Sequence, residues 1–501
     1  MSDNLYALFR QAAPGDDKTF LRTPAGQALT YGDLESGSAR FANALVLLGV
    51  KPGDRVAVQV EKSPETVLLY LGCLRAGAVY LPLNTAYTLN ELAYFIGDAE
   101  PAVVVCDPRT REGVLGLGTG AEVVTLDAMG QGSLADLAAD QSPSFRTVAR
   151  EASDLAAILY TSGTTGRSKG AMLTHANLAS NARTLVEAWR FTPDDVLLHA
   201  LPIFHIHGLF VALNVPLMAG ASLIYLPKFD PEAIIRLLPE ATVMMGVPTF
   251  YVRLLQDERL TAERVSNCRL FVSGSAPLLA ETHHQWSAAT GTAILERYGM
   301  TETGMNTSNP YDGARVAGTV GPPLPDVSLR IADPETGHPV PQGEIGMIEV
   351  KGPNVFAGYW RMPEKTAAEF RADGYFVTGD LGIIDDAGYV QIVGRGKDLI
   401  ISGGFNVYPK EVEGEIDALD GVVESAVIGL PHPDLGEGVT AVVAVAPGAA
   451  LEEAALLKTL AERLAGFKRP KRVIFVEDLP RNTMGKVQKA ALRERYRELY
   501  A

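Results

Sequence analysis

A loop rich in glycine and hydroxyl residues begins at Tyr160, directly after the apolar run DLAAIL. It reads YTSGTTGRSKG; its glycines let backbone N–H groups face an anion, and its Ser and Thr side chains donate further hydrogen bonds. The alternative is a flexible linker, but linkers rarely carry Lys and Arg at the end of a buried strand. The loop therefore predicts a phosphate site formed by Thr161, Ser162, Gly163, Thr164, Thr165, Gly166 and Lys169.

The charge balance and the cysteines limit the classes of partner and compartment. The chain carries 44 Lys and Arg against 59 Asp and Glu, for a net charge of −15, which disfavours a nucleic-acid or anionic-membrane partner. Its three cysteines are widely spaced among apolar residues, which predicts a reduced intracellular protein. Because no signal peptide or apolar run of spanning length is recognised, we expect a cytoplasmic protein without membrane insertion.

The length of 501 residues predicts at least two domains, because a single hydrophobic core stops growing well before that size. Short β-branched runs alternate with amphipathic segments, so we expect two α/β units with parallel strands. From about residue 320, Pro, Gly and β-branched residues predict a barrel-like antiparallel unit. The expected fold class is α/β, with a large domain over residues 1–394 and a small α+β domain over residues 395–501.

Seven motifs resemble, in the same order, those of the adenylate-forming superfamily of acyl-CoA synthetases, peptide-synthetase adenylation domains and firefly-type luciferases. The first is not the motif of the P-loop NTPases, because no Gly-Lys-Ser/Thr follows a glycine at the required distance. The resemblance implies an enzyme that uses ATP and Mg²⁺ to activate a carboxylic acid and then transfers the acyl group to coenzyme A. The motifs are YTSGTTGRSKGAMLTH (160–175), PIFHIHGL (202–209), SGSAPL (273–278), ERYGMTET (296–303), TGD (378–380), GRGKDLIISGGFNVYP (394–409) and PRNTMGKVQK (480–489).

In the large domain the resemblance implies an ATP site that works by positioning and charge neutralisation, because AMP transfer is an in-line attack on the α-phosphorus. Glu302 would bind Mg²⁺, and Thr301 would hydrogen-bond the adenylate phosphate. Asp380 would accept the ribose hydroxyls with Arg395 beside it, and Tyr298 would stack on adenine. The other implied nucleotide contacts are Gly274, Ser275, Ala276, Pro277, Gly299 and Met300.

In the small domain the resemblance makes Lys486 the catalytic lysine, which would bridge the attacking carboxylate and the α-phosphate. The small domain of this family rotates after adenylation, and Lys397 stands at the hinge position. Gly403 and Gly404 would then line the tunnel for the thiol arm of CoA, where a side chain would block the sulfur.

Several residues bear on which acid is activated. His205 stands where amino-acid-activating relatives have an Asp for the substrate ammonium, so an α-amino acid is disfavoured and His205 is expected near the reacting carboxylate. His207, Ser275 and Gly299 are expected to line the acyl site, where Gly299 replaces the Trp of acetate-activating relatives.

Two arginines are candidates for a clamp on a second carboxylate, because a guanidinium can donate two parallel hydrogen bonds to it. Arg253 lies in GVPTFYVRLL and Arg297 in ERYGMTET; Arg253 could equally face outward from its helix.

The chain resembles malonyl-CoA synthetases in further segments, which are LPLNTAYTLNELAYFI, GSAPLLAETH and ERYGMTET followed by MNTSNPYDG. This resemblance implies malonate as substrate, with methylmalonate accepted less well. Two alternatives stay open: a ligase for another short-chain or aromatic acid, which would share every catalytic motif, and an enzyme that loads a carrier protein. The sequence gives no indication of the oligomeric state.

Overall fold

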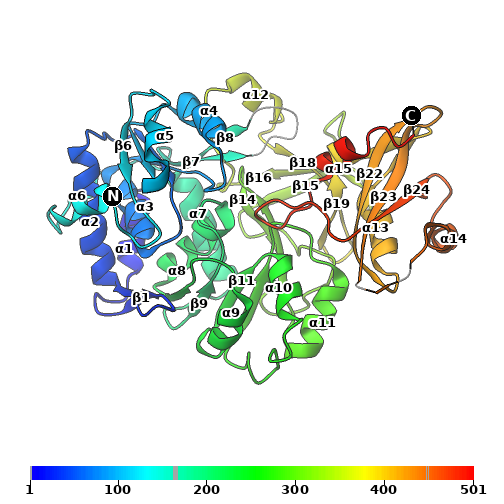
Figure 1. The fold of residues 1–501 in the computed structure, drawn as a ribbon, viewed down its shortest axis with the longest axis horizontal. Coiled ribbons are helices and arrows are strands. Elements are labelled where there is room, and N and C mark those ends of the chain that lie inside the picture. The colour runs from blue at the N-terminus through cyan, green and yellow to red at the C-terminus, as the bar shows by residue number, and fades with distance from the viewer. Residues whose placement is uncertain (1–2, 162–167, 447, 450, 501) are drawn as a thin grey trace.

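The structure is a computed structural model that describes residues 3–161, 168–446, 448–449 and 451–500. These residues form four β-sheets, two of them covered by helices (Figure 1). The amino-terminal α/β units occupy one side of the molecule in Figure 1, and the carboxy-terminal unit, in orange and red, occupies the opposite end. Among the described residues no helix is both long and apolar enough to cross a bilayer.

The first α/β unit is built on a seven-stranded sheet in the order β17-β8-β7-β4-β3-β5-β6. Strands β3 to β7 run parallel, whereas β8 and β17 add an antiparallel edge. Runs such as VVVC are buried on both faces, as expected for parallel strands between helices. The bounds are β3 (Arg55–Gln59), β4 (Val79–Pro82), β5 (Val103–Cys106), β6 (Glu122–Thr125), β7 (Leu155–Thr161), β8 (Lys169–Thr174) and β17 (Gly358–Tyr359).

The second α/β unit is built on an eight-stranded sheet in the order β14-β13-β12-β11-β9-β10-β1-β2. Its strands run parallel except for β14 and β2 at the two edges. The bounds are β1 (Thr19–Arg22), β2 (Ala28–Thr30), β9 (Val196–His199), β10 (Ser222–Tyr225), β11 (Val243–Gly246), β12 (Leu270–Ser273), β13 (Leu295–Met300) and β14 (Gly304–Ser308).

Helices pack against these sheets, and several begin at strong capping residues. Thr30, Thr88 and Thr174 form capping boxes at the starts of α2, α4 and α7, which satisfy backbone N–H groups that a helix start leaves unpaired. The bounds are α1 (Leu5–Ala12), α2 (Tyr31–Leu47), α3 (Pro64–Ala76), α4 (Leu89–Ala99), α5 (Arg111–Leu115), α6 (Ser133–Ala139), α7 (His175–Ala188), α8 (Asn214–Ala219), α9 (Pro231–Leu237), α10 (Pro248–Leu254) and α11 (Ala280–Thr290).

The third unit of the large domain is a four-stranded antiparallel sheet in the order β15-β16-β18-β19, with α12 (Pro363–Ala368) nearby in the chain. Strands β15 and β19 stand at its two edges, so the expected barrel-like unit takes the form of an open sheet within the described residues. The bounds are β15 (Ser328–Ala332), β16 (Gly346–Lys351), β18 (Phe376–Ile384) and β19 (Val390–Arg395).

The carboxy-terminal unit has its own sheet, in the order β21-β20-β23-β22, with β24 parallel to β23. Apolar residues on both sides of this sheet form two small cores that are separate from the core of the large domain. The large mixed α/β domain and the smaller α+β unit confirm the expected fold class. The bounds are β20 (Ile400–Ser402), β21 (Phe405–Val407), α13 (Pro409–Asp417), β22 (Val422–His432), β23 (Gly436–Val445), α14 (Glu453–Arg463), β24 (Arg472–Val476) and α15 (Lys489–Arg495).

Candidate active site

The carboxyl ends of β12 and β13 bring two of the sequence motifs to one edge of the eight-stranded sheet, which is where ligands bind in α/β folds. β12 ends at Ser273, which is also the first residue of the SGSAPL segment. Ser275 in that segment has φ of 73°, a left-handed conformation that is strained for a residue with a side chain. The strain is consistent with a functional turn.

Four side chains, which we call the acyl cluster, meet at this edge: His205, His207, Ser275 and Arg297. Ser275 Oγ lies 3.2 Å from His207 Nδ1, and the His207 backbone N–H donates to His205 Nδ1 at 3.3 Å. Burial lowers the pKa of both histidines, to about 4 for His205, and the positive charge of Arg297 lowers both pKa values further. Both imidazoles are therefore neutral near pH 7 and cannot pair a substrate carboxylate by charge.

Arg297 brings a positive charge into the acyl cluster. Its side chain is 3% exposed, and its Nε and Nη2 are buried without a hydrogen-bond partner among the described residues. Burial lowers its pKa to about 9, which still leaves it charged at neutral pH. A Cβ on Gly274 would lie 2.5 Å from the guanidinium carbon, so the glycine makes room for this side chain. A buried, unpaired charge is costly, and the cluster therefore suits an anionic ligand.

Arg253, the other candidate for the clamp, lies in the last turn of α10 with an exposed side chain. Its guanidinium lies 5.9 Å from the ring centroid of Phe229. Within the described residues no hydrogen bond joins Arg253 to the acyl cluster. The geometry thus favours Arg297, because its donors are buried beside His207.

Gly299 was expected to leave space for the acid. A Cβ at this position would lie 2.2 Å from the carbonyl oxygen of Gly304, so the close approach of β13 and β14 already requires glycine there. This packing requirement explains the glycine without reference to the substrate.

The residues expected at the ribose do lie together. Asp380 is 5% exposed; its Oδ2 accepts a hydrogen bond from the Tyr298 hydroxyl at 2.6 Å, and its Oδ1 pairs with Arg395 Nε at 2.9 Å. Asp380 and Arg395 are direct neighbours across β18 and β19. Of the other expected nucleotide contacts, Ala276 and Met300 are half-buried and Pro277 is exposed.

Glu302 is the buried carboxylate expected to bind Mg²⁺. It is 5% exposed, burial raises its pKa, and its Oε1 accepts a hydrogen bond from Tyr359 at 3.0 Å; Thr301 before it is half-buried. No group of three or more His, Cys, Asp or Glu suited to a metal occurs among the described residues. Mg²⁺ usually binds through one or two carboxylates plus substrate phosphates and water, so a single buried Glu302 fits a metal that arrives with ATP.

The two ends of the phosphate loop lie on the β7–β8 pair, where the Thr161 hydroxyl donates to the Lys169 carbonyl at 3.4 Å. The Lys169 ammonium donates to Glu369 at 3.0 Å. Glu369 and Tyr359 were missed from the sequence because they lie between recognisable motifs. The expected phosphate contacts Ser162, Gly163, Thr164, Thr165 and Gly166 lie outside the described residues.

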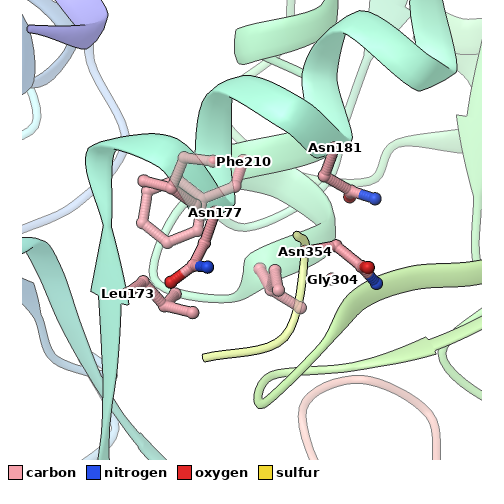
Figure 2. Close-up of a pocket in the computed structure, with 8 residues that line it drawn as sticks. Leu173, Asn177, Asn181, Phe210, Gly304 and Asn354 are labelled. Carbon is pink, nitrogen blue, oxygen red and sulfur yellow. The ribbon is translucent and has the colours of Figure 1, made fainter. Parts of the chain in front are cut away.

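A small cavity between α7 and the start of β14 lies beside the backbone that follows Glu302 (Figure 2). Asn181 exchanges two hydrogen bonds with the backbone of Met305, both 3.0 Å long, and Asn354 donates to the Thr303 carbonyl at 2.6 Å. These two asparagines fix the chain next to Glu302. The cavity, about 10 Å³, has room for one water molecule and not for an acid.

A loop of the carboxy-terminal unit, residues 480–487, docks on the large domain. Met484 is 5% exposed and belongs to the core of the large domain. Thr483 accepts a hydrogen bond from Asn84 at 3.4 Å, and a Cβ on Gly485 would lie 3.0 Å from the Thr249 hydroxyl.

This docking brings Lys486 near Asp380 and Arg395, the residues expected at the ribose. Burial lowers its pKa to about 8; the positive Arg395 lowers it further, whereas Asp380 raises it. The charge of Lys486 also lowers the pKa of His205. Lys486 therefore lies close both to the Asp380–Arg395 pair and to His205 of the acyl cluster, which suits the catalytic role expected of it.

The residues expected to act after domain rotation lie elsewhere. Lys397 is exposed in the single turn Gly396–Asp398 that links β19 to β20. Gly403 and Gly404 form the turn of the β20–β21 hairpin with φ of 58° and 81°, beside an exposed Phe405.

The pH dependence of adenylation should reflect Lys486. The protonated amine is the form that can neutralise carboxylate and phosphate, so we expect kcat/KM for pyrophosphate release to fall above about pH 8. The measurement is a profile between about pH 6.5 and 9.5, with transfer from supplied acyl-adenylate to CoA as the control. A profile that stays flat to the upper limit would contradict this assignment.

The large domain combines two α/β units with an antiparallel sheet, and the small unit places a lysine beside a buried carboxylate of the large domain. Together these features define an adenylate-forming enzyme. Residues 8–360 match the family model "AMP-binding enzyme", and residues 411–486 match "AMP-binding enzyme C-terminal domain". The chain belongs to the AMP-binding enzyme family, which confirms the expected class.

Similar proteins include a feruloyl-CoA synthase of Amycolatopsis sp, 39% identical with 94% of each chain covered, and a malonate–CoA ligase of Arabidopsis thaliana, 35% identical with 97% of this chain and 88% of the relative covered. The chain is also similar to ATP-bound MatB from Rhodopseudomonas palustris, with 64% identity, full coverage of both chains and a TM-score of 0.99. The apo structure of that protein gives a TM-score of 0.87.

Proposed function

We propose that the chain is a malonate–CoA ligase that converts ATP, malonate and CoA into malonyl-CoA, AMP and diphosphate through a malonyl-adenylate. The observation that carries the choice of acid is the buried guanidinium of Arg297, whose Nε and Nη2 have no partner among the described residues. A dicarboxylate supplies the missing anion, and relatives from Arabidopsis thaliana and Mus musculus are malonate–CoA ligases. A cytoplasmic location is part of the proposal and is supported by three free, buried cysteines.

In the first half-reaction one malonate carboxylate oxygen attacks the α-phosphorus of ATP, and the bond to diphosphate breaks. Lys486 neutralises both reacting groups and holds them in line, which is how positioning lowers the barrier. Arg297 pairs with the distal carboxylate, and Asp380 holds the ribose with Arg395 beside it. Mg²⁺ bound by Glu302 supplies charge neutralisation at the phosphates.

In the second half-reaction the thiol sulfur of CoA attacks the acyl carbon, and AMP leaves. We propose that the small domain, residues 395–501, rotates about Lys397 before this step. Rotation withdraws Lys486 and brings the Gly403–Gly404 turn to the acyl-adenylate. The open space around Gly404, where a Cβ would meet no atom within 4 Å, supports a turn that is available for such docking.

An aromatic acid is the competing substrate class, because a feruloyl-CoA synthase is among the similar proteins. Ferulate has no anion at its distal end, so it would leave Arg297 buried and unpaired. An unpaired buried charge costs about 3–5 kcal/mol, which corresponds to a discrimination of about a hundredfold or more.

The test is pyrophosphate release with ATP, Mg²⁺ and CoA across acetate, butyrate, ferulate, malonate, methylmalonate and succinate. We expect kcat/KM for malonate to exceed that for acetate, butyrate and ferulate by about a hundredfold or more, with methylmalonate second. A preference for a monocarboxylate would contradict the malonate assignment and leave the ligase chemistry in place. Activity only with a carrier protein as acyl acceptor would indicate the loading enzyme instead.

A further inference from the structure

Lys169, at the end of the phosphate loop, contacts two side chains from a distant part of the chain. Its ammonium donates to Glu369 Oε1 at 3.0 Å and lies 4.0 Å from the ring centroid of Tyr359. Lys365, on α12, pairs with the same oxygen of Glu369 at 2.9 Å. Lys169 is therefore held from one side by a carboxylate and from another by an aromatic face, both of which attract a cation.

The hydroxyl of Tyr359 connects this arrangement to the buried carboxylate of Glu302. It lies 2.7 Å from Glu369 Oε2 and 3.0 Å from Glu302 Oε1, and the tyrosine is only 2% exposed. A phenol has one hydrogen, so it can donate to only one of the two carboxylates at a time. The other carboxylate oxygen then needs a positive partner, which a metal ion at Glu302 would provide.

The backbone around these residues is firmly positioned. β17, which contains Tyr359, pairs with β8, which begins at Lys169, and the Phe356 N–H donates to the Glu302 carbonyl at 2.8 Å. The Tyr359 N–H donates to Thr366 at 2.9 Å, which joins β17 to the helix that precedes Glu369. The four side chains therefore come from segments that are joined by hydrogen bonds of their backbones, to one another or to the Thr366 side chain.

We propose that Tyr359 and Glu369 are positioning residues for adenylation. They join the half-buried cation of the phosphate loop, Lys169, and the buried carboxylate expected to bind the metal, Glu302, into one network, so that the triphosphate and its Mg²⁺ meet groups held at a fixed separation. This inference rests on the ATP chemistry of the proposed function, but it does not depend on which acid is activated.

The test measures ATP binding by calorimetry without any acid, with excess Mg²⁺ and with EDTA, for the wild type and for Tyr359→Phe. Loss of the hydroxyl leaves two neighbouring carboxylates without a shared donor. In Tyr359→Phe we expect the ratio of ATP affinity with Mg²⁺ to ATP affinity in EDTA to fall about tenfold. The affinity in EDTA itself should change less than about threefold. Tyr375→Phe is the matched control, because its hydroxyl contacts Ser328 on the antiparallel four-stranded sheet and not the network, and it should leave the ratio unchanged.

A second variant tests the other half of the network. Glu369→Gln keeps the shape but removes the charge that holds Lys169, and because the residues act as a unit, its effect and that of Tyr359→Phe should not add in the double variant. The proposal would be overturned if the variants lost ATP affinity equally with and without Mg²⁺, or if the effects of the two substitutions were fully additive. Either result would indicate a merely structural role. Failure of the wild type to bind ATP would overturn the proposed function as well, whereas poor malonate activity with the expected Tyr359→Phe pattern would overturn only the choice of acid.

Discussion

A Lys486→Ala variant is expected to lose the adenylation half-reaction by about a thousandfold while it still transfers the acyl group of supplied malonyl-adenylate to CoA. The physical reason is the location of the amine. The docked loop 480–487 places it beside Asp380 and Arg395 and close enough to His205 to lower the pKa of that histidine. From this place the amine can neutralise both the attacking carboxylate and the α-phosphate.

The two half-reactions can be measured separately, as pyrophosphate exchange into ATP and as formation of malonyl-CoA from malonyl-adenylate. Lys458→Ala is the matched control, because this exposed lysine on α14 lies in the same unit and should change neither rate. Loss of both half-reactions in Lys486→Ala would contradict a role confined to adenylation. It would also count against a second domain arrangement for the thiol step.

The class of enzyme was predictable from the sequence because its motifs match those of a known family, and several of these motifs lie at strand ends. SGSAPL begins at the last residue of β12, and ERYGM lies on β13, its parallel neighbour, so the sheet brings them together without any long-range information. The α/β class followed from alternating buried runs and amphipathic segments. The form of the unit after residue 320 could not be predicted, because turn-rich antiparallel strands look alike in sequence whether a sheet closes into a barrel or stays open.

Tyr359 and Glu369 were not predictable, because their partners are distant in sequence. Glu369 meets Lys169 across 200 residues, and Tyr359 meets Glu302 across 57. Neither has a local pattern that distinguishes it from an ordinary strand tyrosine or surface glutamate. The orientation of Arg253 was equally undetermined, since a residue near a helix end can face either side until the packing of α10 is known.

Arg297→Met is expected to lower kcat/KM for malonate by about a hundredfold or more, and to raise that for butyrate, with little change in ATP binding. Methionine fills a similar space without charge. Because the guanidinium already lacks partners at Nε and Nη2, replacing it with an apolar side chain should leave the melting temperature unchanged or higher. An arginine that destabilises the free protein but is needed for one substrate is typical of a binding site.

Arg253→Ala provides the comparison that decides between the two cations. Its side chain is exposed and contacts Phe229, so its loss should change malonate kcat/KM by less than about threefold. Collapse of malonate activity in Arg253→Ala with normal activity in Arg297→Met would move the clamp to α10. It would then follow that the exposed guanidinium turns inward when malonate binds, and that the buried charge of Arg297 has another partner in the loaded enzyme. Loss in both variants would mean that the two arginines hold the distal carboxylate together, since each oxygen can accept hydrogen bonds from a separate guanidinium.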